Sequence, residues 1–142
     1  MSASRKAVRQ ALANVLRTEC TSAKQVYAYQ KAKLKGQTPV LCVTSAGSLR
    51  DPLSLQGNKA AFALDIHVFV FYSDGKSWTE EQAEDRLDDL EQQIALTVEK
   101  YRKSTSWAHL AYAERSDART PVTLEGFTYL HEVVPVEIQV YA

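Results

Sequence analysis

The chain has 142 residues, 45% of them hydrophobic and 24% charged, and its 17 basic and 17 acidic side chains cancel to a formal net charge of zero. This composition predicts one globular domain, residues 1–142, that can bury its own core, so no second domain is needed. No run of 18 apolar residues and no signal-peptide pattern occurs, so we expect a soluble intracellular protein. The two cysteines, Cys20 and Cys42, have no metal-binding spacing and are predicted to be buried free thiols.

The first half of the chain predicts a helix followed by strands. Residues 4–19 place apolar side chains at helical spacing among basic ones, which indicates an amphipathic helix. Residues 26–29 suggest a short strand, 31–36 a solvated connector, and 39–44 an apolar strand. Residues 45–59 are rich in Ser, Gly, Asp and Pro and predict a long loop, which we expect to form an extended hairpin or arm. Its leucines are too apolar for a linker, and we expect them to become buried on a partner: Leu49, Leu53 and Leu55.

The centre of the chain carries the strongest strand and helix patterns. Residues 62–71 alternate between a wholly apolar face and a face that begins polar and becomes aromatic, which indicates a strand fully covered on one side only. After a turn at residues 73–75, Thr79 is the expected N-cap of a long helix. The apolar stripe of that helix consists of Ala83, Leu87, Leu90, Ile94, Val98 and Tyr101.

The carboxyl-terminal part predicts two more strands, at residues 107–113 and 127–141, separated by a polar loop at 114–126. In the last strand the apolar positions change from odd to even numbers near Val133, which predicts a β-bulge there, with Pro135 at the bulge or on an edge strand. The order of elements predicts an α+β fold, a mostly antiparallel (mixed) β-sheet with two helices packed on one face.

The zero net charge conceals two oppositely charged segments. Residues 1–35 carry eight basic side chains and one acidic side chain, Glu19, whereas residues 74–99 carry nine acidic and two basic ones. These segments, at +7 and −7, either pair within one molecule, which we prefer, or face each other across a head-to-tail subunit contact of the kind that closes rings. The basic segment lacks interleaved aromatic residues and any nucleic-acid-binding motif, so we expect no sequence-specific nucleic-acid binding.

Four residues resemble the components of a catalytic or metal site: Asp65 and His67 on the central strand, and His131 and Glu132 on the last one. His131 and Glu132 point to opposite faces of a regular strand, and no HxH, HExxH or CxxC spacing occurs. We therefore predict no catalytic residue, no metal and no cofactor. A small metal-dependent hydrolase built on Asp65, His67 and His131 is the alternative from a different functional class.

The basic helix, the strand ALDIHVFVFYSD, the helix WTEEQAEDRLDDLEQQIALTVEK and the closing strand YLHEVVPVEIQVYA resemble, in order and texture, a tail terminator (tail completion) protein of long-tailed bacteriophages. The resemblance covers nearly the whole chain without a signature motif. It implies a structural, non-enzymatic virion protein, assembled in the host cytoplasm at the head-proximal end of the tail. Such proteins form a hexameric ring that caps the tail tube, ends tube polymerisation and supplies the surface on which the head docks.

The implied partners are further copies of the chain, the tail tube protein and head-tail connector proteins, with DNA passing nonspecifically through the ring. The implied tube-binding residues lie in the two polar loops: Leu49, Arg50, Asp51, Leu53, Leu55, Arg115, Asp117 and Arg119. The implied subunit-interface residues lie on the two helices: Arg5, Lys6, Arg9, Glu84, Asp85, Asp88 and Asp89. Another head-tail joining or neck component is the alternative within this class, and a monomeric binding module is a third possibility.

Overall fold

The computed structural model describes residues 4–30, 38–53, 57–71, 80–113, 120–124 and 127–141. Side chains are described for all of these except 51–53, 57, 58, 80, 120–124 and 127. The elements are α1 (Arg5–Glu19), β1 (Gln25–Tyr27), β2 (Val40–Leu53), β3 (Gly57–Phe71), α2 (Glu80–Lys100), β4 (His109–Tyr112), β5 (Thr120–Leu124) and β6 (Phe127–Tyr141).

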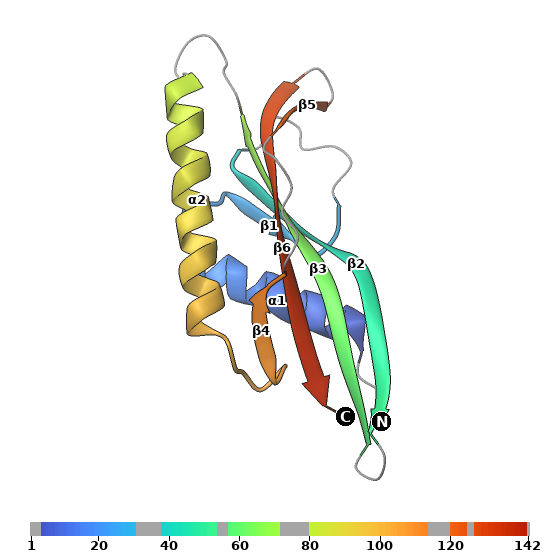
Figure 1. Ribbon diagram of the computed structural model, residues 1–142. Coiled ribbons are helices and arrows are strands. Elements are labelled where there is room, and N and C mark those ends of the chain that lie inside the picture. Colours follow the sequence, from blue (N-terminus) through green and yellow to red (C-terminus); the bar gives the residue numbers. More distant parts are fainter. Residues whose placement is uncertain are drawn as a thin grey trace.

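The strands form one mixed sheet in the order β1-β2-β3-β6-β4, and β5 also pairs with β6. β1 runs parallel to β2, whereas every other neighbouring pair is antiparallel. Both helices lie on the same side of this sheet and run across one another (Figure 1). The predicted α+β class, with a mostly antiparallel sheet and two helices on one face, is therefore confirmed.

The core forms between the helices and one face of the sheet. Ser4 caps α1 because its side chain accepts a hydrogen bond from the Ala7 N–H at 3.1 Å. The apolar stripe of α2 is buried at Ala83, Leu87, Leu90, Ile94 and Val98, as predicted. α1 contributes Val8, Leu12, Ala13 and Leu16 to the same cluster, and β3 contributes Phe62, Leu64, Ile66, Val68 and Val70. This single layer of apolar contacts fixes which face of every central strand points inward.

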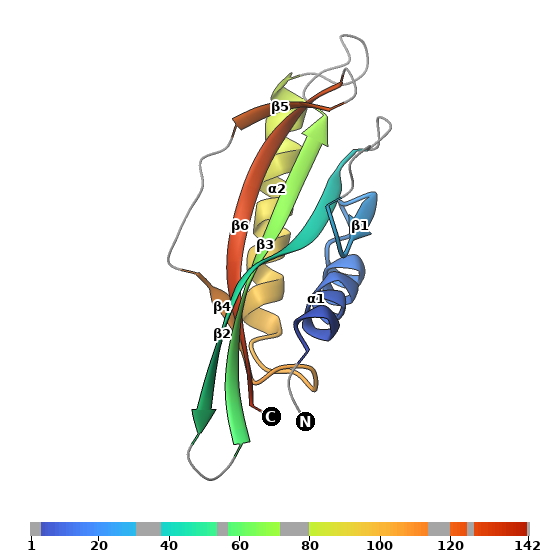
Figure 2. The ribbon, with the colours of Figure 1, turned by 90° about the vertical axis from the view of Figure 1, so that its right-hand side faces the viewer.

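The opposite face of the sheet, which we call the open face, carries no helix among the described residues (Figure 2). Along β3 its side chains are half-exposed from Ala61 to His67, and Phe69 is then buried. Phe69 belongs to a second small core with Val40, Cys42 and Tyr129. The predicted change from a polar to an aromatic face along β3 therefore corresponds to a real change in burial.

The predicted bulge in the last strand is wrong. β6 pairs with β3 in one continuous register from Tyr129 to Tyr141, and the irregularity lies instead in β2, between Ser45 and Gly47. The even-numbered residues of β6 face the helices throughout, and Val133 is half-exposed on the open face, a position that a β-branched residue tolerates. The Pro135 carbonyl accepts from the Ala113 N–H at 3.0 Å, just beyond the β4 ladder.

The two predicted polar loops, residues 45–59 and 114–126, are shorter in the structure than predicted because each contains strand residues. Most of residues 45–59 belongs to the β2–β3 hairpin, which confirms the expected hairpin but not the loop, and Gly57 rather than residue 62 begins β3. Residues 120–124 form β5 inside the second predicted loop. The Gly, Asp and Pro residues of 45–59 and Pro121 of β5 disfavour strands locally, but pairing with an adjacent strand overrides that propensity. The predicted connector at 31–36 and the N-cap Thr79 lie outside the described residues.

Candidate assembly surfaces

The predicted interface residues of α1 form a basic surface made of Arg5, Lys6 and Arg9. Arg5 and Lys6 are exposed, and Arg9 is half-buried. Nη1 of Arg9 donates to the Ser45 hydroxyl at 3.3 Å, which holds this end of α1 over β2. We call these three residues the basic α1 surface.

The predicted interface residues of α2 form an acidic surface made of Glu84, Asp85, Asp88 and Asp89. The three aspartates are exposed and Glu84 is half-buried. They lie in the first half of α2, whose buried stripe faces the sheet. We call these four residues the acidic α2 surface.

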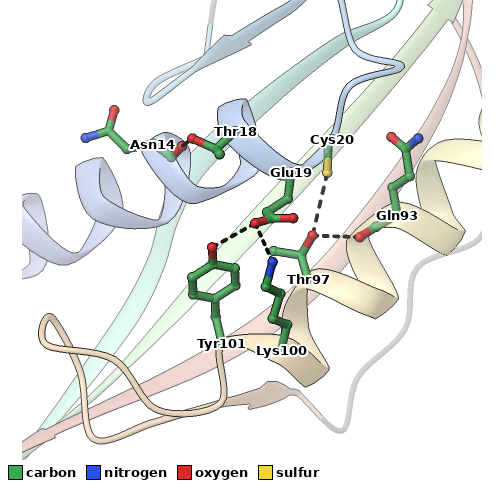
Figure 3. A network of polar contacts seen from close by, with 8 residues as sticks. All are labelled: Asn14, Thr18, Glu19, Cys20, Gln93, Thr97, Lys100 and Tyr101. Carbon is green, nitrogen blue, oxygen red and sulfur yellow. Dashed lines mark hydrogen bonds and ion pairs between the residues drawn. The ribbon is translucent and has the colours of Figure 1, made fainter.

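The two surfaces do not meet where the helices contact each other. That contact joins the last turn of α1 and the residues just after it to the second half of α2, around Gln93, Thr97 and Lys100 (Figure 3). Asp85 lies 12 residues before Thr97, about 18 Å along the helix axis. Among the described residues, the helix contact therefore does not provide the preferred pairing of the two segments within one molecule.

At the helix contact the charges are the reverse of the predicted ones: the acidic residue lies on α1 and the basic residue on α2. Sequence reasoning missed this contact. Glu19 accepts from the Tyr101 hydroxyl at 2.7 Å and from Nζ of Lys100 at 3.0 Å (Figure 3). These hydrogen bonds, the one from Tyr101 first, lower the pKa of Glu19, and the bond to Glu19 raises the pKa of both Lys100 and Tyr101. The available signal was that Glu19 is the single acidic residue of the basic segment.

Two buried side chains complete this junction. The Cys20 sulfur lies 4.0 Å from the hydroxyl of Thr97, which donates to the Gln93 carbonyl at 2.7 Å. Burial raises the pKa of the Cys20 thiol to about 11, so the thiolate is not formed at neutral pH. Cys20 and Cys42 are both free and buried, as predicted.

The predicted tube-binding residues are only partly described. Leu49 is 62% exposed on the hairpin, and the guanidinium of Arg50 lies 5.2 Å from the centre of the Phe62 ring. Asp51 and Leu53 belong to β2, but their side chains are outside the description. Four further residues lie entirely outside the described ranges: Leu55, Arg115, Asp117 and Arg119.

A shallow hollow of about 340 Å³ lies on the open face beside the hairpin. Small residues line it, namely Gly47, Ala61 and Ala63, and it is bordered by Leu49 and by Glu137 and Gln139. Sequence reasoning did not find this hollow, because its small residues become neighbours only through the register of β2 with β3.

The histidines that resembled a catalytic site are brought together, because β3 and β6 are neighbours. Nδ1 of His67 lies 2.9 Å from Nε2 of His131, and Nε2 of His67 lies 3.1 Å from the Thr44 hydroxyl. His131 also stacks on Phe69 at 4.5 Å. Glu132 pairs with Val68 and so belongs to the face that the helices cover, whereas Asp65 lies on the open face. The cluster thus joins three strands through ring contacts and hydrogen bonds.

No group of three or more His, Cys, Asp or Glu side chains within the described ranges could hold a metal ion. Neither helix in the described part of the chain has the length and hydrophobicity of a membrane-spanning segment.

In comparisons with known proteins, no family model and no curated protein matches the chain.

Proposed function

We propose that this chain is the subunit of a phage tail terminator, a structural ring that caps the tail tube, ends its polymerisation and presents a docking surface for the head. The supporting observation is that the basic α1 surface and the acidic α2 surface lie on two different helices and do not meet at the contact between those helices. Two complementary patches at different places on one subunit suit heterologous, head-to-tail contacts, which close into a ring when the rotation allows it.

The exposed hairpin supports the second half of this proposal. Leu49 is a large apolar side chain in solvent next to a hollow of small residues. Scattered exposed leucines are ordinary on protein surfaces, but this one borders a hollow at the end of the sheet, where a partner can bury both. We assign the hairpin end of the sheet, with Leu49 and the hollow, as the surface that contacts the tail tube or the adjacent ring.

The test has two parts. Native mass measurement of the purified protein should give a closed oligomer, expected to be a hexamer, and electron microscopy of phage lacking the protein should show tails of uncontrolled length. Tails of normal length that fail to join heads would instead assign the chain to the neck, and a monomer that binds no tail component would refute both assignments.

A further inference from the structure

We infer that neighbouring copies of this chain join by continuing the β-sheet, with the unpaired edge of β2 in one copy meeting the edge of β4 near Tyr112 in the next. The inference rests on the proposed ring function and specifies its subunit contact.

The first observation is the long unpaired edge of β2. β3 pairs with β2 from Val40 to Leu53, whereas β1 covers the other edge only from Val40 to Cys42. Among the described residues, no strand pairs with that edge over residues 43–53. A row of main-chain N–H and C=O groups on such an edge is a template for another strand.

The second observation is that the opposite edge of the sheet, at β4, is exposed at the position that lies directly across the sheet from Ser45. Ser45 of β2 pairs with Leu64 of β3. Leu64 pairs with Val136, which in turn pairs with Tyr112 of β4. The Leu110 N–H already donates to the Arg102 carbonyl at 2.8 Å, so the alternation of a strand leaves the main-chain groups of Tyr112 facing outward. The contact is therefore short and centred on Tyr112.

The third observation is the direction of the strands. Three antiparallel steps separate β2 from β4, so the two edge strands run in opposite directions. When one copy follows another head to tail, β2 and the neighbouring β4 are consequently antiparallel, which is the more stable pairing.

The fourth observation is the charge at each edge. Arg9 is hydrogen-bonded at Ser45 and Arg50 is exposed further along β2. Tyr112 is 46% exposed at the other edge, where burial and then Glu91, Glu132 and Glu99 raise the pKa of its hydroxyl. Pairing β2 with β4 brings unlike charges together, whereas pairing two β2 edges or two β4 edges brings like charges together. The basic α1 surface also lies over β2, so this arrangement places it beside α2 of the neighbour.

Chemical crosslinking tests the arrangement with two single-cysteine additions. Ser48→Cys and Tyr112→Cys each replace an exposed side chain at one edge, and the native thiols are buried and do not compete. A short bis-maleimide should link the two variants when they are mixed and should link neither variant to itself. Thr21→Cys, exposed beside the helix junction, is the matched control and should not crosslink with either variant.

Hydrogen exchange on the unmodified protein gives a second readout that does not depend on a variant. The outward amide of β2 next to Ser45, which lies level with Tyr112, should exchange about tenfold more slowly in the oligomer than in the dissociated subunit. Crosslinking of Ser48→Cys to itself would show an isologous β2 contact and overturn the inference. A closed oligomer with neither mixed crosslinks nor amide protection would also overturn it while leaving the tail terminator proposal intact. Mixed crosslinks in a protein that caps no tube would support the β2–β4 contact and refute the tail terminator proposal.

Discussion

Reversing the charge of the acidic α2 surface is the most direct perturbation of the proposed assembly. We consider the triple variant Asp85→Lys, Asp88→Lys and Asp89→Lys. All three side chains are exposed and none belongs to the buried stripe of α2, so the free energy of unfolding should change by less than about 1 kcal/mol. Self-association should weaken strongly, because each aspartate that attracted a neighbouring cation would be replaced by a lysine that repels it.

The size of the effect follows from the exposure of these groups. Two unit charges about 5 Å apart in water interact by about 0.8 kcal/mol, so each reversal shifts the contact by about 1.7 kcal/mol and three shift it by about 5 kcal/mol. Screening at physiological ionic strength reduces the total to about 2.7 kcal/mol, or about 100-fold in the dissociation constant of each subunit contact. At 1 M salt the same estimate falls to about 1 kcal/mol, or about fivefold.

Sedimentation velocity over a concentration series at both salt concentrations measures this change. Adding the reversals Arg5→Glu and Lys6→Glu to the same chain should restore much of the association, because a head-to-tail contact then again joins unlike charges; Arg9 is kept because it holds α1 at Ser45. An unchanged oligomer in the triple variant would show that the acidic α2 surface is only solvated. Failure of the fivefold variant to recover any association would disprove pairing between these two surfaces.

Three further outcomes are expected. Replacing residues 51–59 by Asn-Gly should keep the Tm within a few degrees, because the helix-covered core lies elsewhere, but should abolish tube capping in electron micrographs; unfolding would instead make the hairpin part of the core. The lowered pKa of Glu19 means that its contribution to stability is present above the ordinary carboxyl pKa and is lost as the pH falls through the folded value. The stability gap between wild type and Glu19→Gln in urea titrations should therefore be larger at pH 7 than at pH 3, and a gap independent of pH would contradict this assignment. Ellman's reagent should leave Cys20 and Cys42 unmodified in the native protein and should label both in urea; rapid native labelling would contradict their burial.

The parts of the fold that were predictable from the sequence are those in which local pattern and tertiary packing agree. β3 and α2 bury the residues that their periodicities of two and 3.6 mark as apolar, as Leu64 and Leu90 illustrate. The closing strand was found from end to end because its β-branched residues suit both a buried and a half-exposed face. In each case one face of the element determines the structure, and the sequence shows that face directly.

The errors occurred where pairing between strands decides the structure. β5 and the first residues of β3 form strands because they pair with a neighbouring strand. The local sequence of each segment does not contain that information. The misplaced bulge has the same origin, because Val133 reads as a core residue although its partner His67 lies on the open face. The hollow and the junction at Glu19 likewise join residues far apart in the chain.

The arrangement of charge is compatible with the proposed assembly of this chain into a ring. The formal net charge is zero, so each added copy brings as many cations as anions, and a growing ring is not opposed by its total charge. Concentrating the cations on α1 and the anions on α2 gives each subunit two unlike faces, whereas the same charges mixed over the surface would give it none. The described contacts between α1 and α2 lie at the last turn of α1, where an acidic residue of α1, Glu19, pairs with a basic residue of α2, Lys100. In the proposed ring, the basic α1 surface and the acidic α2 surface, which this junction does not use, would meet on neighbouring copies.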